Sequence, residues 1–488
     1  MAWSSGAAPV LLVLAGALAA GAEPTCPSLS SPSPTKHMDA FLRLAAERRV
    51  SAPPPVVLFL PGTPGSRLVR RSDGAVLFGE GRVDAGRIHL GDPRNRDVTA
   101  EVLPSYRAYG VVSEEVYRGT LRQLKEAVGD VGEVHGWGFD WRLGAGELAD
   151  ALQAHLAASF AGRDVVIVAH SFGGLVAWRW QETHDPWAAR VEHLVILGAP
   201  FQGACETARF LLKGYRPPPD APTDWLTRFA YKLLMGELRP ASYTFPSTYQ
   251  LLPAQGCLEK LTVGTGGDHA VLPLDPLSVE LWKGPLGSQL VAHAWEELET
   301  TPAVFWATVE RAIAEAKSTR PDPARRRVRN VRAFYSSDYA TTRQVRLVVD
   351  GDDRLVRDEV VEQAGLGHDN PMVVTAPGDG RVPACEPPGC PLKDVCLDRI
   401  ALTHGQLADS AQLRAYVAHV LPATVKALRV RATLRPMTAP HDLPGIDWAA
   451  LRDEVAATGT DVSGLEALAQ ARFPGKPLSA LTLGPSIP

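Results

Sequence analysis

The sequence predicts an α/β fold with a mostly parallel central sheet, crossover helices and an inserted cap, or lid, domain. Apolar, largely β-branched runs at 56–60, 165–168 and 191–197 are continuous rather than alternating, which is typical of strands buried on both faces of a parallel sheet. Segments of helical character separate these runs, as crossover connections between parallel strands require. From residue 204 to residue 327 this alternation of predicted strands and helices is interrupted, which indicates a cap inserted over one edge of the sheet.

Length and composition are those of a globular protein. The 488 residues are enough for a large core, and 50 Lys and Arg residues nearly balance 54 Asp and Glu residues. That balance lacks the strong positive charge typical of nucleic-acid-binding domains, so we expect no nucleic-acid partner. A hydrophobic content of 45%, with 43 glycines and 41 prolines, indicates a loop-rich fold. The composition does not predict an oligomeric state.

The first 22 residues resemble a secretory signal peptide. The apolar stretch 10–20 ends in Ala20-Gly21-Ala22, which resembles a small-residue cleavage site, although no Lys or Arg precedes the stretch. We therefore expect export to a periplasmic, extracellular or lumenal compartment. Residues 23–55, which include a Ser/Pro-rich run at 27–34, are predicted to form an N-terminal linker.

Export makes the cysteines relevant, because thiols in an oxidising compartment usually pair. The count is even, but the sequence leaves the pairing open among Cys26, Cys205, Cys257, Cys385, Cys390 and Cys396. A zinc site formed by the last three cysteines and His404 is a weaker alternative, since their spacing matches no familiar zinc pattern. We expect neither a metal ion nor a cofactor.

Ser171 stands where a predicted strand meets a predicted helix, in Ala169-His170-Ser171-Phe172-Gly173. A nucleophilic serine at such a sharp turn needs small residues two positions before and after it, because larger ones collide with the neighbouring strand or helix. Ala169 and Gly173 meet this condition. An ordinary serine in a glycine-containing loop is the alternative, but the flanking strand and helix favour a nucleophile.

The predicted strand 56–60 ends in the loop Pro61-Gly62-Thr63-Pro64-Gly65-Ser66. In α/β-hydrolases the loop after such a strand and the residue after the nucleophile each supply a backbone N–H to the oxyanion hole. Since proline has no N–H, the candidates here are Thr63 and Phe172. An ordinary Pro/Gly turn is the alternative for this loop.

Residues 67–104 are polar and glycine-rich, and we expect an excursion from the core there. Ser113-Glu114-Glu115 predicts the start of a helix that continues through Val128, because serine caps helices and acidic residues suit their N-terminal ends. Asp140 and Arg142 are expected to pair with each other or with loop backbone in a structural role.

A serine nucleophile needs a general base, and in this fold the chain order is serine, acid, histidine. His404 is our candidate because it follows the apolar segment 399–403 and precedes Gly405, so it sits on a loop at a strand end. Three other late histidines fit less well. His368 precedes the best acid candidate, His419 falls in a helical pattern, and His441 lies in a proline-rich tail.

Two groups of carboxylates could supply the acid. Asp379 lies between two glycines after the apolar run 372–374, and tight glycine backbone can direct a short side chain into a site. Asp352, in Asp350-Gly351-Asp352-Asp353, is the rival. For both residues the alternative is a solvent-exposed acidic side chain in a turn, without a catalytic role.

The predicted core comprises residues 56–203 and 328–430, with the cap between them at 204–327 and a C-terminal tail at 431–488 that has a short helical patch at 448–457. In the cap, apolar residues recur at helical spacing from Trp225 to Leu234. We expect Trp225 and Phe229 to contact a bound acyl chain, whereas internal packing of the cap is the alternative.

Seven segments together resemble the lecithin:cholesterol acyltransferase-like family, which includes lysosomal phospholipase A2 and the phospholipid:diacylglycerol acyltransferases. They occur in family order between residue 56 and about residue 420: Leu60-Pro61-Gly62 with Gly65-Ser66, Asp140-Trp141-Arg142-Leu143, Ala169-His170-Ser171-Phe172-Gly173, Gly198-Ala199-Pro200-Phe201-Gln202-Gly203, Phe245-Pro246-Ser247, Gly378-Asp379-Gly380-Arg381-Val382-Pro383 and Thr403-His404-Gly405.

The resemblance implies that Ser171 is the nucleophile, Asp379 the acid and His404 the base, and it favours Asp379 over Asp352. It also matches Thr63 and Phe172 to the oxyanion positions. The chain departs from the family in two places. Arg381 stands where the family usually has threonine, and no cysteine lies between residues 27 and 204, where relatives have a disulfide-closed, membrane-binding excursion.

The expected activity is therefore that of a serine-dependent lipid acyl hydrolase or O-acyltransferase that works through an acyl-enzyme. The resemblance implies a phospholipid or other lipid ester as acyl donor, and water, a sterol or another alcohol as acceptor. It also implies transient contact with a membrane or lipid surface. A lipase or carboxylesterase acting on neutral esters is one alternative, and a non-catalytic lipid-binding relative is another.

Overall fold

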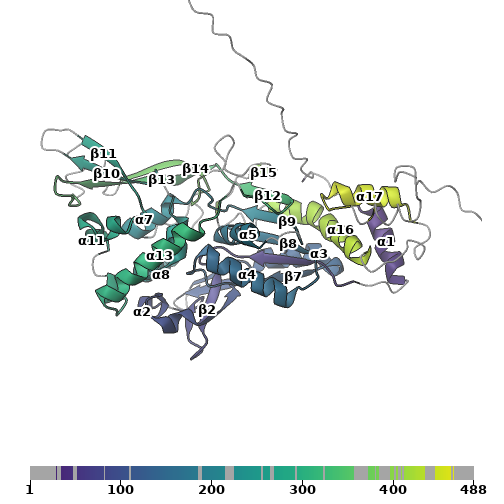
Figure 1. Ribbon diagram of the computed structural model, residues 1–488, viewed down its shortest axis with the longest axis horizontal. Coiled ribbons are helices and arrows are strands. Elements are labelled where there is room, and N and C mark those ends of the chain that lie inside the picture. The colour runs from purple at the N-terminus through teal and green to yellow at the C-terminus, as the bar shows by residue number, and fades with distance from the viewer. Residues whose placement is uncertain are drawn as a thin grey trace, which may run out of the picture.

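A computed structural model of the chain describes residue 29 and most of residues 34–465 (Figure 1). The gaps within this range are 48–51, 82, 109–111, 185–189, 215–224, 254–255, 264–268, 292–293, 323–324, 357–371, 380, 384–395, 400–402, 405–407, 409–410, 435–445 and 463–464. Residues 1–22, which were predicted to be a signal peptide, lie outside the described residues.

A six-stranded sheet forms the centre of the molecule, and every pair of neighbouring strands in it is parallel. In spatial order its strands are β15 (Cys396–Arg399), β12 (Asn330–Tyr335), β9 (Val191–Leu197), β8 (Val165–His170), β1 (Val56–Leu60) and β7 (Glu133–Gly136). The predicted mostly parallel sheet is confirmed.

Alternate residues of the central strands belong to two separate cores, because successive side chains of a strand point to opposite faces. On one face, Val56 and Ile167 pack with α4 (Ala145–Ser159) and α5 (Phe172–Thr183). On the other, Val57 and Val168 pack with α3 (Arg118–Val128) and α16 (Leu421–Leu434). This explains the continuous apolar runs in the sequence, since both faces of each strand are covered by helices.

A second sheet of four strands stands at one end of the molecule, on the left in Figure 1. In spatial order its strands are β11 (His269–Leu274), β10 (Leu258–Val263), β13 (Tyr339–Val349) and β14 (Met372–Gly378). Strand β10 pairs in parallel with β13, so strands from both sides of the predicted boundary at residue 328 share this sheet. Strands β13 and β14, which the sequence assigned to the core, therefore belong to one sheet with strands of the cap.

Helices accompany the second sheet and connect it to the core. They are α7 (Cys205–Lys213), α8 (Trp225–Ser242), α9 (Pro246–Leu251), α10 (Val279–Lys283), α11 (Pro285–Leu290), α12 (Ala294–Glu297) and α13 (Pro302–Thr319). Helix α13 packs against both α9 and α4, and α7 packs against β13. The cap elements are thus in direct contact with the helical layer of the core.

The excursion after β1 forms two small sheets. The first contains β3 (Val76–Phe78), β2 (Ser66–Arg70) and β4 (Val98–Val102), and the second contains β5 (Ser105–Ala108) and β6 (Val112–Glu115). The same excursion includes helix α2 (Ala85–Ile88) and a 3-10 turn at Pro93–Arg96. The helix predicted to begin at Ser113 begins instead at Arg118. Ser113 lies in β6, opposite Arg107 of β5. Residues 113–115 have the pattern of a helix N-cap, but their pairing with β5 holds them in a strand.

Arg142 anchors this excursion to the core, as the predicted pairing with Asp140 implied. Its guanidinium is fully buried and donates to both carboxylate oxygens of Asp140, at 2.7 and 2.6 Å. It also donates to the carbonyl oxygens of Ile88, at 2.8 Å, and Asn95, at 2.7 Å. A buried charge is tolerated where it is paired and hydrogen-bonded, and these bonds fasten the α2 region to the loop after β7.

The predicted linker and tail pack together at the end opposite the second sheet (Figure 1). Residues Lys36–Glu47 of the linker form helix α1, and Trp448–Ala457 of the tail form α17, the predicted helical patch. The rings of Phe41 and Trp448 meet edge to face, and Glu454 accepts backbone hydrogen bonds from His37 and Met38, both at 2.9 Å. Part of the segment expected to be a linker is therefore a packed helix.

Two of the six cysteines have described side chains, and both are buried free thiols, Cys205 and Cys257. A hydrogen bond with Cys205, together with burial, raises the pKa of the Cys257 thiol. Cys26, Cys385 and Cys390 lie outside the described residues, as does the side chain of Cys396. Within the described part of the chain, no three His, Cys, Asp or Glu side chains are grouped so as to hold a metal ion.

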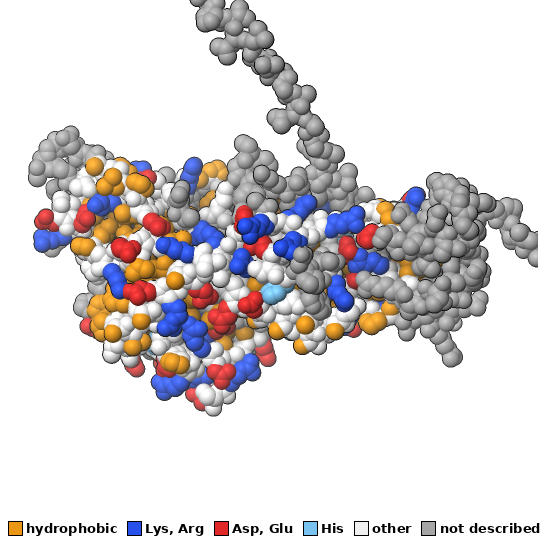
Figure 2. All heavy atoms as spheres, in the orientation of Figure 1, with side chains coloured by type: hydrophobic (Ala, Val, Ile, Leu, Met, Phe, Trp, Pro, Cys, Tyr) orange, Lys and Arg blue, Asp and Glu red, His pale blue; other side chains and the backbone are white. Residues whose placement is uncertain are grey.

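The surface carries both signs of charge. Figure 2 shows basic and acidic side chains interspersed over the visible face, with hydrophobic side chains more frequent at the end that holds the second sheet. Large exposed hydrophobic residues of the cap are Leu233, Val271, Leu272 and Val304. None of the helices that the structure describes has the length and hydropathy needed to span a membrane.

Candidate active site

Ser171 occupies the sharp turn between β8 and α5. Its backbone has φ 52° and ψ −123°, a conformation that residues other than glycine rarely adopt. The surrounding structure must hold it in that conformation. A Cβ at position 173 would lie 2.3 Å from the carbonyl oxygen of Pro61, so only glycine fits there. The requirement for small residues around the predicted nucleophile thus has a physical basis in this structure.

The loop after β1 lies directly against Ser171. A Cβ added to Gly62 would be 2.8 Å from the Cβ of Ser171 and 3.3 Å from its Oγ. Thr63 follows in this loop, and Phe172 is the first residue of α5, where backbone N–H groups have no partner within the helix. The loop that carries Thr63 and the N-terminus of α5 therefore both adjoin the serine.

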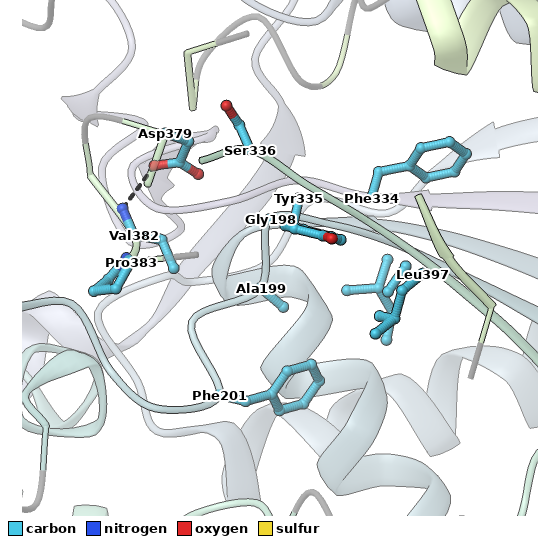
Figure 3. A pocket seen from close by; sticks show the side chains of 12 residues that line it. Gly198, Ala199, Phe201, Phe334, Tyr335, Ser336, Asp379, Val382, Pro383 and Leu397 are labelled. Atoms are coloured by element: carbon cyan, nitrogen blue, oxygen red, sulfur yellow. Dashed lines mark hydrogen bonds between the residues drawn. The ribbon is translucent and has the colours of Figure 1, made fainter. Parts of the chain in front are cut away.

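Asp379 follows β14 of the second sheet, and its side chain is 2% exposed. The carboxylate Oδ1 accepts hydrogen bonds from the backbone N–H groups of Arg381, at 2.9 Å, and Val382, at 2.6 Å. Figure 3 shows the second of these bonds as a dashed line. The turn after β14 therefore fixes one carboxylate oxygen and leaves Oδ2 free to receive another donor.

His404 supplies that donor. Its Nδ1 lies 2.7 Å from Asp379 Oδ2, and its Nε2 lies 2.8 Å from Ser171 Oγ. Because a carboxylate only accepts, Nδ1 carries the proton, and Nε2 accepts from the serine hydroxyl. The backbone N–H of His404 also donates to the carbonyl oxygen of Asp379, at 2.9 Å. Two hydrogen bonds to one residue thus set the orientation of the imidazole.

The structure brings Ser171, Asp379 and His404 together, and it keeps the rival acid away. Asp352 lies in the exposed turn after β13, with 77% of its side chain accessible, and its carboxylate is 4.0 Å from Arg354. Trp225 and Phe229 lie in α8, but their side chains fall outside the described residues. Their expected contact with an acyl chain remains a prediction.

Arg381, which departs from the family pattern, has a local role in the structure. Its backbone N–H is one of the two donors to Asp379, and its guanidinium pairs with Glu206 of α7 at 3.1 Å. Glu206 is buried and also accepts from the hydroxyl of Thr342 on β13, at 2.5 Å. Through Arg381, the turn that carries Asp379 is therefore linked by an ion pair to α7, the first helix of the cap.

A small cavity of about 20 Å³ lies behind the acid. Figure 3 shows Phe201, Phe334, Tyr335 and Leu397 around it, with Asp379 and Ser336 at one side. Its volume is that of one water molecule, so it has no room for an acyl chain.

Two residues beside the site had no role in the sequence prediction. The hydroxyl of Tyr117, at the start of α3, accepts from the backbone N–H of Gly62, at 2.9 Å, and lies 2.7 Å from Nδ1 of His170. The Nε2 of His170 lies 3.0 Å from the carbonyl oxygen of His404. His170 belongs to the motif around Ser171, but no sequence pattern connects Tyr117 with it, since 53 positions separate them.

This arrangement has the parts that acyl transfer requires. The serine hydroxyl lies within hydrogen-bond distance of one imidazole nitrogen, and a carboxylate holds the other nitrogen. The loop after β1 and the N-terminus of α5 adjoin the serine. No part of it needs a metal ion. The chemistry that fits such a set of groups is nucleophilic attack of the serine on an ester carbonyl.

One known protein family matches the segment that contains the serine. The sequence profile of the family described as lecithin:cholesterol acyltransferase matches residues 108–261, which include Ser171 but neither Asp379 nor His404. No curated protein sequence matched the chain.

Similarity to solved structures is distant. The Tle4–Tli4 complex matches with 14% identity and a TM-score of 0.44, over 79% of this chain and 100% of that one. RedJ, with a polyethylene glycol molecule in its active site, matches with 13% identity and a TM-score of 0.26, over 76% and 93%. Phospholipase PlaB from Legionella pneumophila matches with 10% identity and a TM-score of 0.20, over 59% and 70%.

The parallel sheet with helices on both faces, the serine at a strand-to-helix turn and the family match agree with one another. The chain has an α/β fold with a parallel central sheet, and residues 108–261 match the family described as lecithin:cholesterol acyltransferase.

Proposed function

We propose that the chain is a serine-dependent lipid acyl hydrolase or O-acyltransferase, with Ser171 as nucleophile, His404 as general base and Asp379 as the acid that orients it. The observation that carries this proposal is the continuous hydrogen-bonded set from Asp379 Oδ2 through His404 to Ser171 Oγ, at 2.7 and 2.8 Å. The family match over residues 108–261 supports a lipid ester as the substrate.

In the proposed mechanism, Ser171 Oγ attacks the ester carbonyl carbon while His404 Nε2 takes the hydroxyl proton. The backbone N–H groups of Thr63 and Phe172 donate to the oxyanion that develops on the carbonyl oxygen. His404 then gives its proton to the departing alcohol, which leaves an acyl-enzyme. Water or a second alcohol, deprotonated by His404, attacks the acyl carbon. The bond to Ser171 Oγ breaks, His404 returns the proton to that oxygen, and a fatty acid or a new ester is released.

We propose a phospholipid or another lipid ester as acyl donor and water, a sterol or another alcohol as acceptor, in transient contact with a lipid surface. The exposed hydrophobic residues at the cap end support that contact, because an apolar surface at one end of the molecule suits a lipid interface. We also propose export, on the signal-like pattern of residues 1–22.

Product analysis tests this proposal. The full chain is incubated with vesicles of phosphatidylcholine and cholesterol, and the lipids are separated and identified. Free fatty acid with lysophospholipid indicates hydrolysis, and cholesteryl ester indicates transfer. Neither product should form with Ser171→Ala. If the wild type cleaves only neutral esters such as triacylglycerols, the activity is that of a lipase or carboxylesterase. Absence of turnover on every ester would instead leave a non-catalytic lipid-binding protein.

A further inference from the structure

Tyr117 and His170 form a buried polar chain that joins two loops of the site. Each is 5% exposed, and their rings meet edge to face with centroids 5.7 Å apart. One end of the chain is the N–H of Gly62, in the loop that carries Thr63. The other end is the carbonyl oxygen of His404. This chain of hydrogen bonds therefore connects the loop beside the oxyanion position to the backbone of His404.

The partners at the two ends fix the direction of every hydrogen bond. The His404 carbonyl oxygen only accepts, so Nε2 of His170 must carry a proton and donate to it. Burial, together with the nearness of His404, lowers the pKa of His170 to about 3, so the ring is neutral and its Nδ1 accepts. Tyr117 must then donate to Nδ1, which leaves its oxygen to accept from the Gly62 N–H. Each ring nitrogen and the hydroxyl has one defined role.

The surrounding residues are shaped to hold Tyr117 in place. A Cβ at position 65 would lie 2.8 Å from Cε2 of Tyr117, so the glycine leaves room for the ring. Phe59 packs edge to face against the same ring, at 5.0 Å between centroids. One turn further along α3, the hydroxyl of Thr120 donates to the carbonyl oxygen of Ala408, at 2.7 Å. The start of α3 thus contacts both the loop after β1 and the segment that follows His404.

We propose that Tyr117 and His170 are positioning residues, which hold the loop of the oxyanion position and the backbone of His404 in a fixed relation to Ser171. This inference rests on the proposed function. Their hydrogen bonds go to the Gly62 N–H and the His404 carbonyl oxygen, and the His170 ring also packs 5.0 Å from the His404 imidazole, between centroids. Both therefore act through the groups that they hold. Displacing a reacting group by about 1 Å can cost 10²-fold in rate, so breaking the chain should slow catalysis without weakening substrate binding.

Four variants of the full chain test this inference. Tyr117→Phe removes only the hydroxyl. His170→Gln keeps an amide donor for the His404 carbonyl, whereas His170→Leu keeps none. Tyr249→Phe is the matched control, since Tyr249 is also fully buried and donates its hydroxyl hydrogen to a backbone oxygen, that of Tyr243, at 2.9 Å. The measurements are kcat and KM on a short, soluble p-nitrophenyl ester, with melting temperatures.

We expect Tyr117→Phe to lower kcat at least about 10-fold with KM within twofold of wild type, while Tyr249→Phe lowers the melting temperature comparably and leaves kcat unchanged. His170→Gln should retain several times the kcat of His170→Leu. Equal kcat in Tyr117→Phe and Tyr249→Phe, or equal loss in His170→Gln and His170→Leu, overturns the positioning role. A wild type that neither hydrolyses esters nor reacts with a fluorophosphonate overturns the proposed function itself.

Discussion

The imidazole Nε2 of His404 lies 2.8 Å from the hydroxyl oxygen of Ser171, although 233 positions separate them in the chain. Ser171 follows β8 and His404 follows β15, which is three places away in the sheet. Neighbouring strands are about 4.8 Å apart, so the two strand ends are separated by roughly 14 Å. The base must therefore be carried back over two intervening strands, and its backbone bonds to Asp379 and His170 hold it there.

The acid is tested by exchanging each candidate carboxylate for an amide. Asp379→Asn should lower kcat by on the order of 10⁴-fold, because an amide no longer holds His404 in the tautomer that accepts from Ser171. Asp352→Asn is the matched control. Its side chain is 77% exposed in a turn, so its activity should stay close to wild type. The opposite order of losses would identify Asp352 as the acid.

The approach of the loop after β1 is tested by Gly62→Ala. The added Cβ would lie 2.8 Å from the Cβ of Ser171, so the loop or the serine must shift. We expect kcat/KM on a short ester to fall at least about 10-fold. Gly236→Ala is the control, since a Cβ there meets nothing within 4 Å and alanine favours the helix. Wild-type activity in Gly62→Ala would show that the loop does not act in catalysis.

Lowering the pH should reduce the stability of the fold, because two buried histidines are neutral in the folded state. Burial lowers the pKa of His170 to about 3, and burial with the nearby charge of Arg431 does the same for His193. In the unfolded chain a histidine has a pKa of about 6.5. The unfolded state therefore binds more protons below pH 6.5, and stability falls as the pH decreases towards 3.

Between pH 7 and pH 5.5 each of these histidines should cost about 1 kcal/mol of unfolding free energy. Urea unfolding at the two pH values measures this loss together with the contributions of the other groups that titrate in the same range. In His193→Gln the loss should be smaller by about 1 kcal/mol, because one of the two groups no longer takes up a proton. An identical loss in this variant and in wild type would contradict the assignment.

The cap is tested by chain length. If Trp225 and Phe229 contact a bound acyl chain, replacing both by alanine should reduce turnover of long-chain esters far more than that of short ones. Burial is worth about 0.8 kcal/mol per methylene, so the difference should grow with each carbon that reaches the cap. Equal losses on short and long esters, with a lower melting temperature, would indicate that both side chains pack inside the cap.

Local sequence patterns predicted the elements whose signals are local. The apolar run 56–60 coincides with β1, and the residues around Ser171 predicted a strand, a sharp turn and a helix in the right places. Chain order and glycine context led to Asp379 and His404, which the structure brings beside Ser171. The choice of His404 needed only spacing and residue type, whereas the preference for Asp379 over Asp352 came from the family resemblance.

Features that depend on contacts between distant segments were not predictable in this way. The second sheet pairs β10 with β13, across the expected boundary at residue 328, and no local pattern records that pairing. Ser113 has the sequence context of a helix cap but is held in a strand by its pairing with β5. Helix α1 lies in a segment whose neighbours are Ser/Pro-rich, and its burial depends on α16 and α17 at the far end of the chain.

The central claim is that Ser171 is the nucleophile, and covalent labelling tests it most directly. The full chain is treated with a fluorophosphonate, digested and analysed by mass spectrometry. The predicted result is one adduct, on the peptide that contains Ser171, which is absent from Ser171→Ala and forms far more slowly in Asp379→Asn. An adduct on another serine, or an unlabelled Ser171 in a preparation that turns over lipid esters, would contradict the proposed site.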